Sequence, residues 1–523
     1  MGRPAPYVLD SSVAVMTANR GVNGSSQKKA APVPKIGSWT IGLINSSYKY
    51  LSAETFGFKV NANGKAMKKK QVWFLEPHGD EDSISLRCHM DRFLAVDQFG
   101  NVTCEKEERD DTCKFEISFC DDFSGRLALR SVSRGYFLGA SADKLICSAR
   151  SPGDGELWFV NMAVRPHLNL RSLGRKRFAR LSEEKTEVQV EEIVPWGGDT
   201  LFSLEFQEEA HKYAVRSSND RYLARDGRLL PEISPECLFA CEYHGGYLAL
   251  RDQAGLYLSP TGSRSVLKTR SSVVTKDQLF SLEDSPPQAS FQAVTNHRFI
   301  SVKQGVDVTA NQEAIGDHET FQLEFDTSAS KWSMRSTQDK YFTLQAGGGL
   351  QAGEPQPASA ALFDLIWLED GAVAFKAENG KYVGTKKSGH LFANVDTIEE
   401  RSKYYFYLTN RPILVLRCQQ GFVGCRGASD QRLECNLASY ATIQVERASQ
   451  GQVHFKGQNG KYWQVTEKGV LCDSQVPQSF FMELRGSNRM YIKTAGGQYV
   501  VEQKNGGLAV GGTDSEHATL WEC

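Results

Sequence analysis

The residues that could do chemistry are spread along this chain without forming a catalytic motif. The ten histidines are scattered, and neither His-Glu-x-x-His nor a zinc-spaced set of His and Cys is present. There is no Gly-x-Ser-x-Gly elbow, and each Gly-Lys pair is followed by Ala or Tyr, which excludes a P-loop. The twelve cysteines include no Cys-x-x-Cys, a pattern typical of a reduced, cytosolic protein. The sequence therefore predicts no enzyme, metal site or cofactor.

Clusters of basic residues are the chemistry that remains. Lys plus Arg number 61 and Asp plus Glu 62, so a net charge of −1 excludes a uniform polycation. Basic residues nevertheless gather at 65–70, 171–180, 264–276 and 386–387. Such clusters indicate several separate contacts with an acidic polymer. Nucleic acid is not favoured, because the aromatic residues are committed to a structural repeat rather than interleaved with the basic ones.

That repeat must position the clusters. An aromatic residue, usually flanked by a basic or polar residue and an aliphatic one, recurs at steps of 35 to 44 residues. The twelve markers are Tyr50, Phe93, Tyr136, Phe178, Tyr222, Tyr257, Phe299, Tyr341, Tyr382, Phe422, Tyr462 and Tyr499. A second aromatic, as in Trp73-Phe74-Leu75 and Phe321-Gln322-Leu323, runs in phase with the first. Gly-containing turns lie between them, so each unit is predicted to hold about four short strands.

Twelve repeats of this kind fit two all-β architectures. Propellers of WD40 type have units of similar length, but no Gly-His…Trp-Asp signature is present. Three units can instead close into one β-trefoil, which protects the edges of the sheet. We therefore predict an all-β protein of four tandem β-trefoils, about 121 residues each.

The predicted boundaries leave a disordered leader at 1–38 and trefoils at 39–164, 165–286, 287–410 and 411–523. Two junctions contain Arg-Pro and one contains Pro-Pro, which suits short, stiff connections and a rigid particle. The leader lacks the apolar core of a signal peptide. No run reaches the roughly 18 apolar residues that span a bilayer, so membrane insertion is not expected.

Several stretches of the sequence closely resemble fascin, the actin-bundling protein. They are Ile41–Asn45, Lys49–Ala62, Phe99–Glu105, Gly174–Arg177, Val194–Gly197, Thr320–Glu324, Asn410–Ile413, Gly421–Arg426 and Leu520–Glu522. The match runs from about residue 39 to the end, and the chain is identified as a family member of the invertebrate type. The resemblance implies four β-trefoils and a non-enzymatic, cytosolic monomer. Such a monomer would crosslink F-actin into tight parallel bundles in filopodia and similar cell projections.

The resemblance also implies which residues bind actin, on three surfaces. The first surface is expected to use Lys49, Lys68, Lys69, Lys70, Lys386, Lys387 and Arg426. The second is expected to use Arg126, Arg134 and Arg411, and the third Arg175, Arg177, Lys268 and Lys276.

Three departures from the family pattern bear on these surfaces. Ala66 stands where the family has a regulatory phosphoserine, so inhibition by phosphorylation there is not expected. Gly427 and Val501 replace basic residues of the family, which shifts the first surface toward Lys68–Lys70 and Lys386.

A glycan- or heparin-binding trefoil protein is the alternative function, because lectins share this fold. One Gln71-Val72-Trp73 matches the Gln-x-Trp of trefoil lectins, but it does not recur in the other units.

Overall fold

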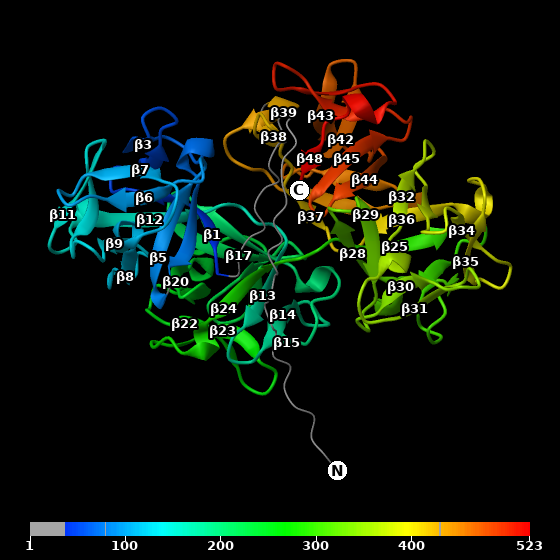
Figure 1. Cartoon of the computed structure of the whole chain (residues 1–523), viewed down its shortest axis with the longest axis horizontal. Helices are drawn as coiled ribbons and strands as arrows, with labels where there is room; N and C mark the ends of the chain where they lie inside the picture. The colour runs from blue at the N-terminus through cyan, green and yellow to red at the C-terminus, as the bar shows by residue number, and fades with distance from the viewer. Residues whose placement is uncertain (1–36, 79, 428–429) are drawn as a thin grey trace, which may run out of the picture. The chain divides into compact units, whose positions relative to one another are not determined.

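The computed structural model describes residues 37–78, 80–427 and 430–523, and nearly all of the predicted leader lies outside this part of the chain. Forty-eight short strands and eleven 3-10 helices make up the regular structure of the described residues (Figure 1). The 3-10 helices are η1 Lys69–Gln71, η2 Asp111–Cys113, η3 Asp154–Glu156, η4 Gly198–Thr200, η5 Pro235–Cys237, η6 Lys276–Gln278, η7 Asp317–Glu319, η8 Ser359–Ala361, η9 Glu400–Ser402, η10 Ser449–Gly451 and η11 Ser515–His517.

The first twelve strands build one closed unit. They are β1 Trp39–Ile44, β2 Tyr50–Ala53, β3 Val60–Gly64, β4 Trp73–His78, β5 Asp80–Cys88, β6 Phe93–Val96, β7 Val102–Lys106, β8 Phe115–Phe119, β9 Leu127–Ser131, β10 Phe137–Ser141, β11 Lys144–Ala149 and β12 Leu157–Met162. Strands β1, β4, β5, β8, β9 and β12 pair in that order and β12 returns to β1, which makes a six-stranded barrel. The hairpins β2–β3, β6–β7 and β10–β11 meet through Lys144–Asn61 and Lys59–Thr103 pairing. A barrel with a triplet of hairpins is the β-trefoil.

The same ring closes three more times. The second unit holds β13 Leu168–Ser172, β14 Arg177–Leu181, β15 Val188–Glu192, β16 Phe202–Gln207, β17 Lys212–Ser217, β18 Tyr222–Leu223, β19 Leu229–Leu230, β20 Ala240–His244, β21 Tyr247–Arg251, β22 Tyr257–Thr261, β23 Val266–Ser271 and β24 Phe280–Asp284. The third holds β25 Gln288–Ala293, β26 Phe299–Ser301, β27 Thr309–Gln312, β28 Phe321–Asp326, β29 Lys331–Arg335, β30 Tyr341–Leu344, β31 Leu350–Glu354, β32 Asp364–Trp367, β33 Val373–Lys376, β34 Tyr382–Thr385, β35 Leu391–Val395 and β36 Tyr404–Leu408. The fourth holds β37 Ile413–Leu414, β38 Phe422–Gly427, β39 Asp430–Leu437, β40 Ile443–Arg447, β41 Val453–Lys456, β42 Tyr462–Thr466, β43 Gly469–Ser474, β44 Phe480–Gly486, β45 Arg489–Thr494, β46 Val500–Glu502, β47 Leu508–Val510 and β48 Trp521–Glu522. The prediction of four β-trefoils is therefore confirmed, while the domain boundaries stay predictions.

The aromatic repeat explains where strands begin. Nine of the twelve markers are the first residue of a strand in the described chain, and Tyr136, Phe178 and Tyr499 lie one residue away from a strand start. The second aromatic fills the barrel: Trp73, Phe115, Phe202 and Phe280 open β4, β8, β16 and β24 and are almost fully buried. Large aromatic residues favour strands because their side chains pack on a pleated surface.

The cysteines take a repeated place in this core. The thiols of Cys104, Cys147 and Cys472 donate to the carbonyls of Arg92, Tyr136 and Lys461, each at or beside an aromatic marker. A buried thiol behaves as a small apolar side chain with a weak donor. These three cysteines therefore take the same place in their hairpins.

Neighbouring trefoils share buried contacts. Between the first and second trefoils, the Tyr213 hydroxyl donates to the Val160 carbonyl at 2.7 Å and accepts from the Met162 amide at 2.7 Å. Between the third and fourth, the Lys493 ammonium donates to the Leu368 carbonyl at 3.0 Å. One continuous apolar core spans each of these two pairs of trefoils.

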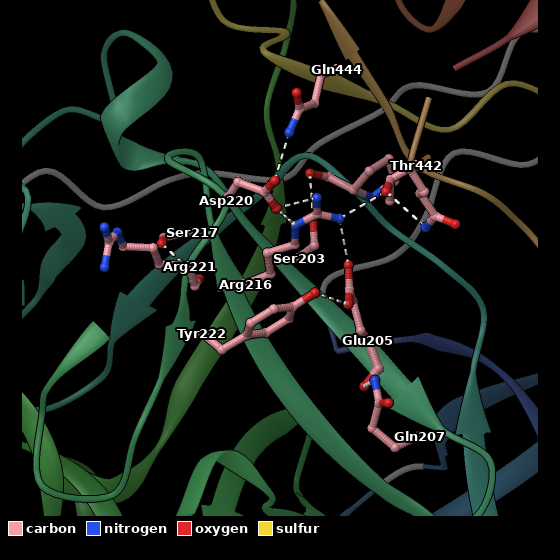
Figure 2. Close-up of polar contacts among 12 residues, drawn as sticks. Ser203, Glu205, Gln207, Arg216, Ser217, Asp220, Arg221, Tyr222, Thr442 and Gln444 are labelled. Carbon is pink, nitrogen blue, oxygen red and sulfur yellow. Dashed lines mark hydrogen bonds and ion pairs between the residues drawn. The ribbon is translucent and has the colours of Figure 1, made fainter. Parts of the chain in front are cut away.

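A buried arginine joins the second trefoil to the fourth. Figure 2 shows Arg216 of β17 held between Glu205 and Asp220. Its guanidinium also donates to the Thr442 hydroxyl at 2.9 Å, and the Gln444 amide donates to Asp220 at 2.6 Å. Thr442 and Gln444 belong to the fourth trefoil, so a charged network crosses this contact.

A second buried site lies where the second, third and fourth trefoils meet. His167 shares a 2.7 Å hydrogen bond with the Ile413 carbonyl, and Arg411 donates to the Ser285 carbonyl at 2.7 Å. Burial, together with the nearby Arg411 charge, holds the pKa of His167 well below its usual range. The imidazole is therefore neutral in the folded chain at neutral pH.

We predict that His167 makes the free energy of unfolding depend on pH. Its pKa is lower in the folded than in the unfolded chain, so the unfolded state binds more protons. Stability that is present above about pH 6.5 is then lost as the pH falls, by about 1.4 kcal/mol per pH unit. Denaturant unfolding of the wild type and of His167→Gln between pH 7.5 and 5.5 measures this difference. Other histidines cancel in the comparison, and equal pH slopes for the two proteins would contradict the assignment.

Candidate basic binding surfaces

The Lys68–Lys70 cluster lies on a rigid turn of the first trefoil. Lys69 and Lys70 belong to η1, and Gln71 at its end is buried. The Gln71 amide donates to the Ser52 hydroxyl at 2.8 Å and accepts from the Lys68 amide at 3.2 Å. These bonds fix the turn to β2, the strand that begins directly after Lys49. The side chains of Lys68, Lys69 and Lys70 are all exposed. The buried Gln71 side chain thus fixes a turn on which three lysines are exposed.

The charges of this turn are only partly compensated. Lys70 pairs with Glu54 at 2.6 Å, whereas no ion pair of Lys68 or Lys69 occurs in the described chain. His89 lies close enough that its pKa is lowered, first by burial and then by Lys69 and Lys70. Nothing in the sequence indicated that His89 would lie near these lysines. The turn therefore carries a net positive charge, from Lys68 and Lys69.

The third and fourth trefoils contribute the other residues expected on the first surface. Lys386 and Lys387 are exposed on the turn between β34 and β35, and the Lys386 ammonium lies 3.1 Å from the centre of the Phe392 ring. Arg426 is exposed on β38 but pairs with Glu434 at 2.8 Å. The two lysines are therefore better placed than Arg426 to bind an acidic partner.

The structure does not support all of the second expected surface. Arg411 is only 4% exposed and its guanidinium is bonded to backbone carbonyls, so it is not available at the surface. Burial lowers its pKa to about 10. Arg126 is partly buried and bonded to both Asp122 and Asp154, which cancel its charge. Arg134 is partly exposed, with its guanidinium over the Tyr136 ring. We correct the expectation for Arg411: it is a junction residue rather than a contact residue.

On the second trefoil, the fold brings separate parts of the sequence together. The Gly174 amide donates to the Lys276 carbonyl at 2.9 Å, which places the Arg175–Arg177 turn beside η6. A β-carbon at Gly174 would lie 2.1 Å from an Asp277 side-chain oxygen and 3.1 Å from the Asp277 Cα, so a larger residue would displace the Asp277 side chain and crowd η6. Arg175, Arg177 and Lys276 are exposed, whereas Lys268 on β23 is half-buried. Three of the four residues expected on the third surface are thus accessible.

The residues that suggested a lectin are internal. Trp73 is fully buried and its indole donates to the Leu51 carbonyl at 3.0 Å, and Gln71 holds the lysine turn. Neither side chain is presented for a sugar. Within the described chain, no helix has the length and apolarity needed to cross a membrane.

The fold and these surfaces define a class: a tandem protein of four β-trefoils with basic turns on different units. A model of the fascin domain matches residues 47–160, 168–282, 295–406 and 419–523. Fascin-2 of Bos taurus is 37% identical over 485 residues, covering 92% of this chain and 97% of the relative. Fascin of Strongylocentrotus purpuratus is 32% identical over 501 residues, covering 92% and 98%. The chain belongs to the fascin family.

A vertebrate and an echinoderm protein both match, so the invertebrate type stays a prediction. Among solved structures, the designed threefold-symmetric protein ThreeFoil aligns with 24% of this chain and 97% of its own, at 21% identity and a TM-score of 0.21. The β-trefoil assignment rests on the strand pairing described above.

Proposed function

We propose that this protein binds actin filaments and crosslinks them into tight parallel bundles, as a monomer that uses at least two separate basic surfaces. The observation that carries the proposal is its membership of the fascin family, whose members are non-enzymatic actin crosslinkers. The positive charge that would bind an acidic filament lies on exposed turns at Lys68–Lys70, at Lys386–Lys387, and around Arg175, Arg177 and Lys276.

Bundling by one chain requires that the filament-binding surfaces keep a fixed separation. The buried contacts of Tyr213, Arg216 and Lys493 each join two trefoils. Such desolvated, hydrogen-bonded groups resist relative movement of the units. They support the proposal of a rigid crosslinker.

The binding energy is expected to be electrostatic and distributed. A filament surface is acidic, and each exposed ion pair contributes only about 0–1 kcal/mol. Several lysines and arginines must therefore act together, and salt screens them over a distance of about 10 Å at 0.1 M ionic strength.

The cellular setting follows from this function. A crosslinker of this family is expected in the cytoplasm, on the cytoskeleton of actin-rich projections such as filopodia. The alternative of glycan or heparin binding is weaker, because Gln71 and Trp73 are used inside the first trefoil.

Low-speed co-sedimentation with F-actin across a salt series tests the proposal. We expect the filaments to pellet as bundles at low salt and physiological pH, and pelleting to decline steadily as salt rises, since screening weakens each exposed contact. Filaments that stay dispersed at low salt would contradict bundling. Retention on a heparin or sugar column without any actin binding would favour the alternative.

A further inference from the structure

Two thiols and a carboxylate meet on the fourth trefoil. Cys418 follows β37, Cys435 lies on β39, and Glu502 ends β46. Their sulfur and oxygen atoms all lie within 4.8 Å of one another, the one such set of three in the described chain. Cys435 is buried, while Cys418 and Glu502 are partly exposed, so an ion from solvent can reach the group.

The fold holds these three residues in place from separate segments. The Cys435 amide donates to the Gly506 carbonyl at 2.7 Å, which attaches β39 to the turn between β46 and β47. A β-carbon on Gly506 would lie 2.0 Å from the Asn436 amide nitrogen, so a larger residue would push the turn away. The Gln420 amide donates to Glu502 at 3.0 Å and to the Gln503 carbonyl at 3.0 Å. A bond of this kind orients a metal-binding carboxylate.

We propose that Cys418, Cys435 and Glu502 bind a zinc ion. Thiolates select soft or borderline metals, which excludes Ca²⁺ and Mg²⁺ as the natural ion of this set. Zinc accepts mixed sulfur and carboxylate ligands in a tetrahedron, and three protein ligands leave its fourth position to water. Binding releases the protons of both thiols to solvent, since the thiolate is the ligand.

The other close thiols explain why the carboxylate matters. Cys88 and Cys104 of the first trefoil also lie within hydrogen-bonding distance of each other. The Cys104 thiol donates to the Arg92 carbonyl, just as the Cys435 thiol donates to the Gly506 carbonyl at 3.3 Å and the Cys418 thiol to the Cys435 carbonyl at 3.5 Å. The difference is that no third ligand accompanies Cys88 and Cys104 in the described chain. They serve as an internal control with similar thiol chemistry.

A bound zinc ion would tie β39 to the β46–β47 hairpin, which forms a small sheet of its own. A ligand that binds only the folded state stabilises it by mass action. Zinc should therefore raise the melting temperature of the fourth trefoil, whether or not the protein bundles actin.

The test uses the untagged full chain, reduced and freed of metal with a chelator, and titrated with Co²⁺ and then Zn²⁺. We expect one equivalent of Co²⁺ to give thiolate charge-transfer absorption that Zn²⁺ abolishes. Cys418→Ser and Glu502→Gln should each weaken binding at least about tenfold, whereas Cys88→Ser should not. Zinc should also protect the partly exposed Cys418 from alkylation detected by mass spectrometry, whereas the partly exposed Cys120 of the first trefoil should react equally with and without zinc.

Both variants change partly exposed side chains, and circular dichroism checks that they fold. Absence of the charge-transfer signal in the reduced protein would overturn the proposal. So would equal Co²⁺ binding by folded Cys418→Ser, or a Cys418–Cys435 disulfide in the wild type whose reduction does not restore Co²⁺ binding.

Discussion

Replacing Arg216 with alanine should lower the free energy of unfolding by about 3–5 kcal/mol. The Arg216 side chain is 7% exposed and its partner Glu205 is 10% exposed, so both are largely out of water. Alanine would leave the Glu205 carboxylate buried without its cation and would remove the bond to Thr442 in the fourth trefoil. Denaturant unfolding of the two proteins measures the difference.

Two further variants separate the causes of this loss. Arg216→Ala combined with Glu205→Gln removes the stranded charge and should recover part of the stability, which a double-mutant cycle quantifies. Thr442→Ala keeps the Glu205 pair and should cost about 1 kcal/mol. A change below 1 kcal/mol for Arg216→Ala would show that the network does not stabilise this contact.

Reversing the charge of Lys68, Lys69 and Lys70 to glutamate should abolish bundling. Each exposed lysine contributes up to about 1 kcal/mol, and reversal replaces attraction with repulsion. The three changes together should cost this surface about 3 kcal/mol, or roughly a hundredfold in affinity. We expect filaments to stay out of the low-speed pellet, while high-speed sedimentation still detects binding through the remaining surfaces.

A matched control distinguishes this surface from a change in net charge. Lys144, Arg150 and Lys468 are also exposed but lie outside the basic clusters. Reversing these three shifts the net charge equally and should leave bundling intact. If the Lys68–Lys70 variant bundles as well as the control, the first surface is wrong, although the family's function would stand.

The fold could be predicted from the sequence because its signal is repeated twelve times. Tyr50, Tyr222 and Tyr462 sit in different trefoils but open strands in the same way, since each packs the same place in a hairpin. Such a local pattern produces the same strands and turns wherever it recurs along the chain. Near Tyr136 the predicted marker is one residue off: Phe137 opens β10 and stands immediately before the bulge, the place that Tyr257 and Tyr341 take in their own hairpins.

The binding surfaces were only partly predictable. Lys68–Lys70 are exposed as expected, because a run of lysines on a turn is costly to bury. Arg411 and Arg126 have the same residue type and equally plain sequence contexts. One is buried at a junction and the other is bonded to Asp154, 28 residues away. Asp122, four residues before Arg126, is a local partner, but the sequence around these arginines does not indicate Asp154 or the burial of Arg411.

The amino-acid sequence by itself determined an all-β chain of twelve repeats, its grouping into four trefoils and the places where positive charge gathers. Periodicity and residue type are local properties, and local sterics and apolar burial translate them directly into strands and turns. Only the tertiary structure decided which charges remain available, that Gly174 brings Lys276 beside the Arg175–Arg177 turn, and that Cys418, Cys435 and Glu502 meet. These outcomes depend on contacts between residues far apart in the chain, and only the closing of each barrel brings such residues within bonding distance.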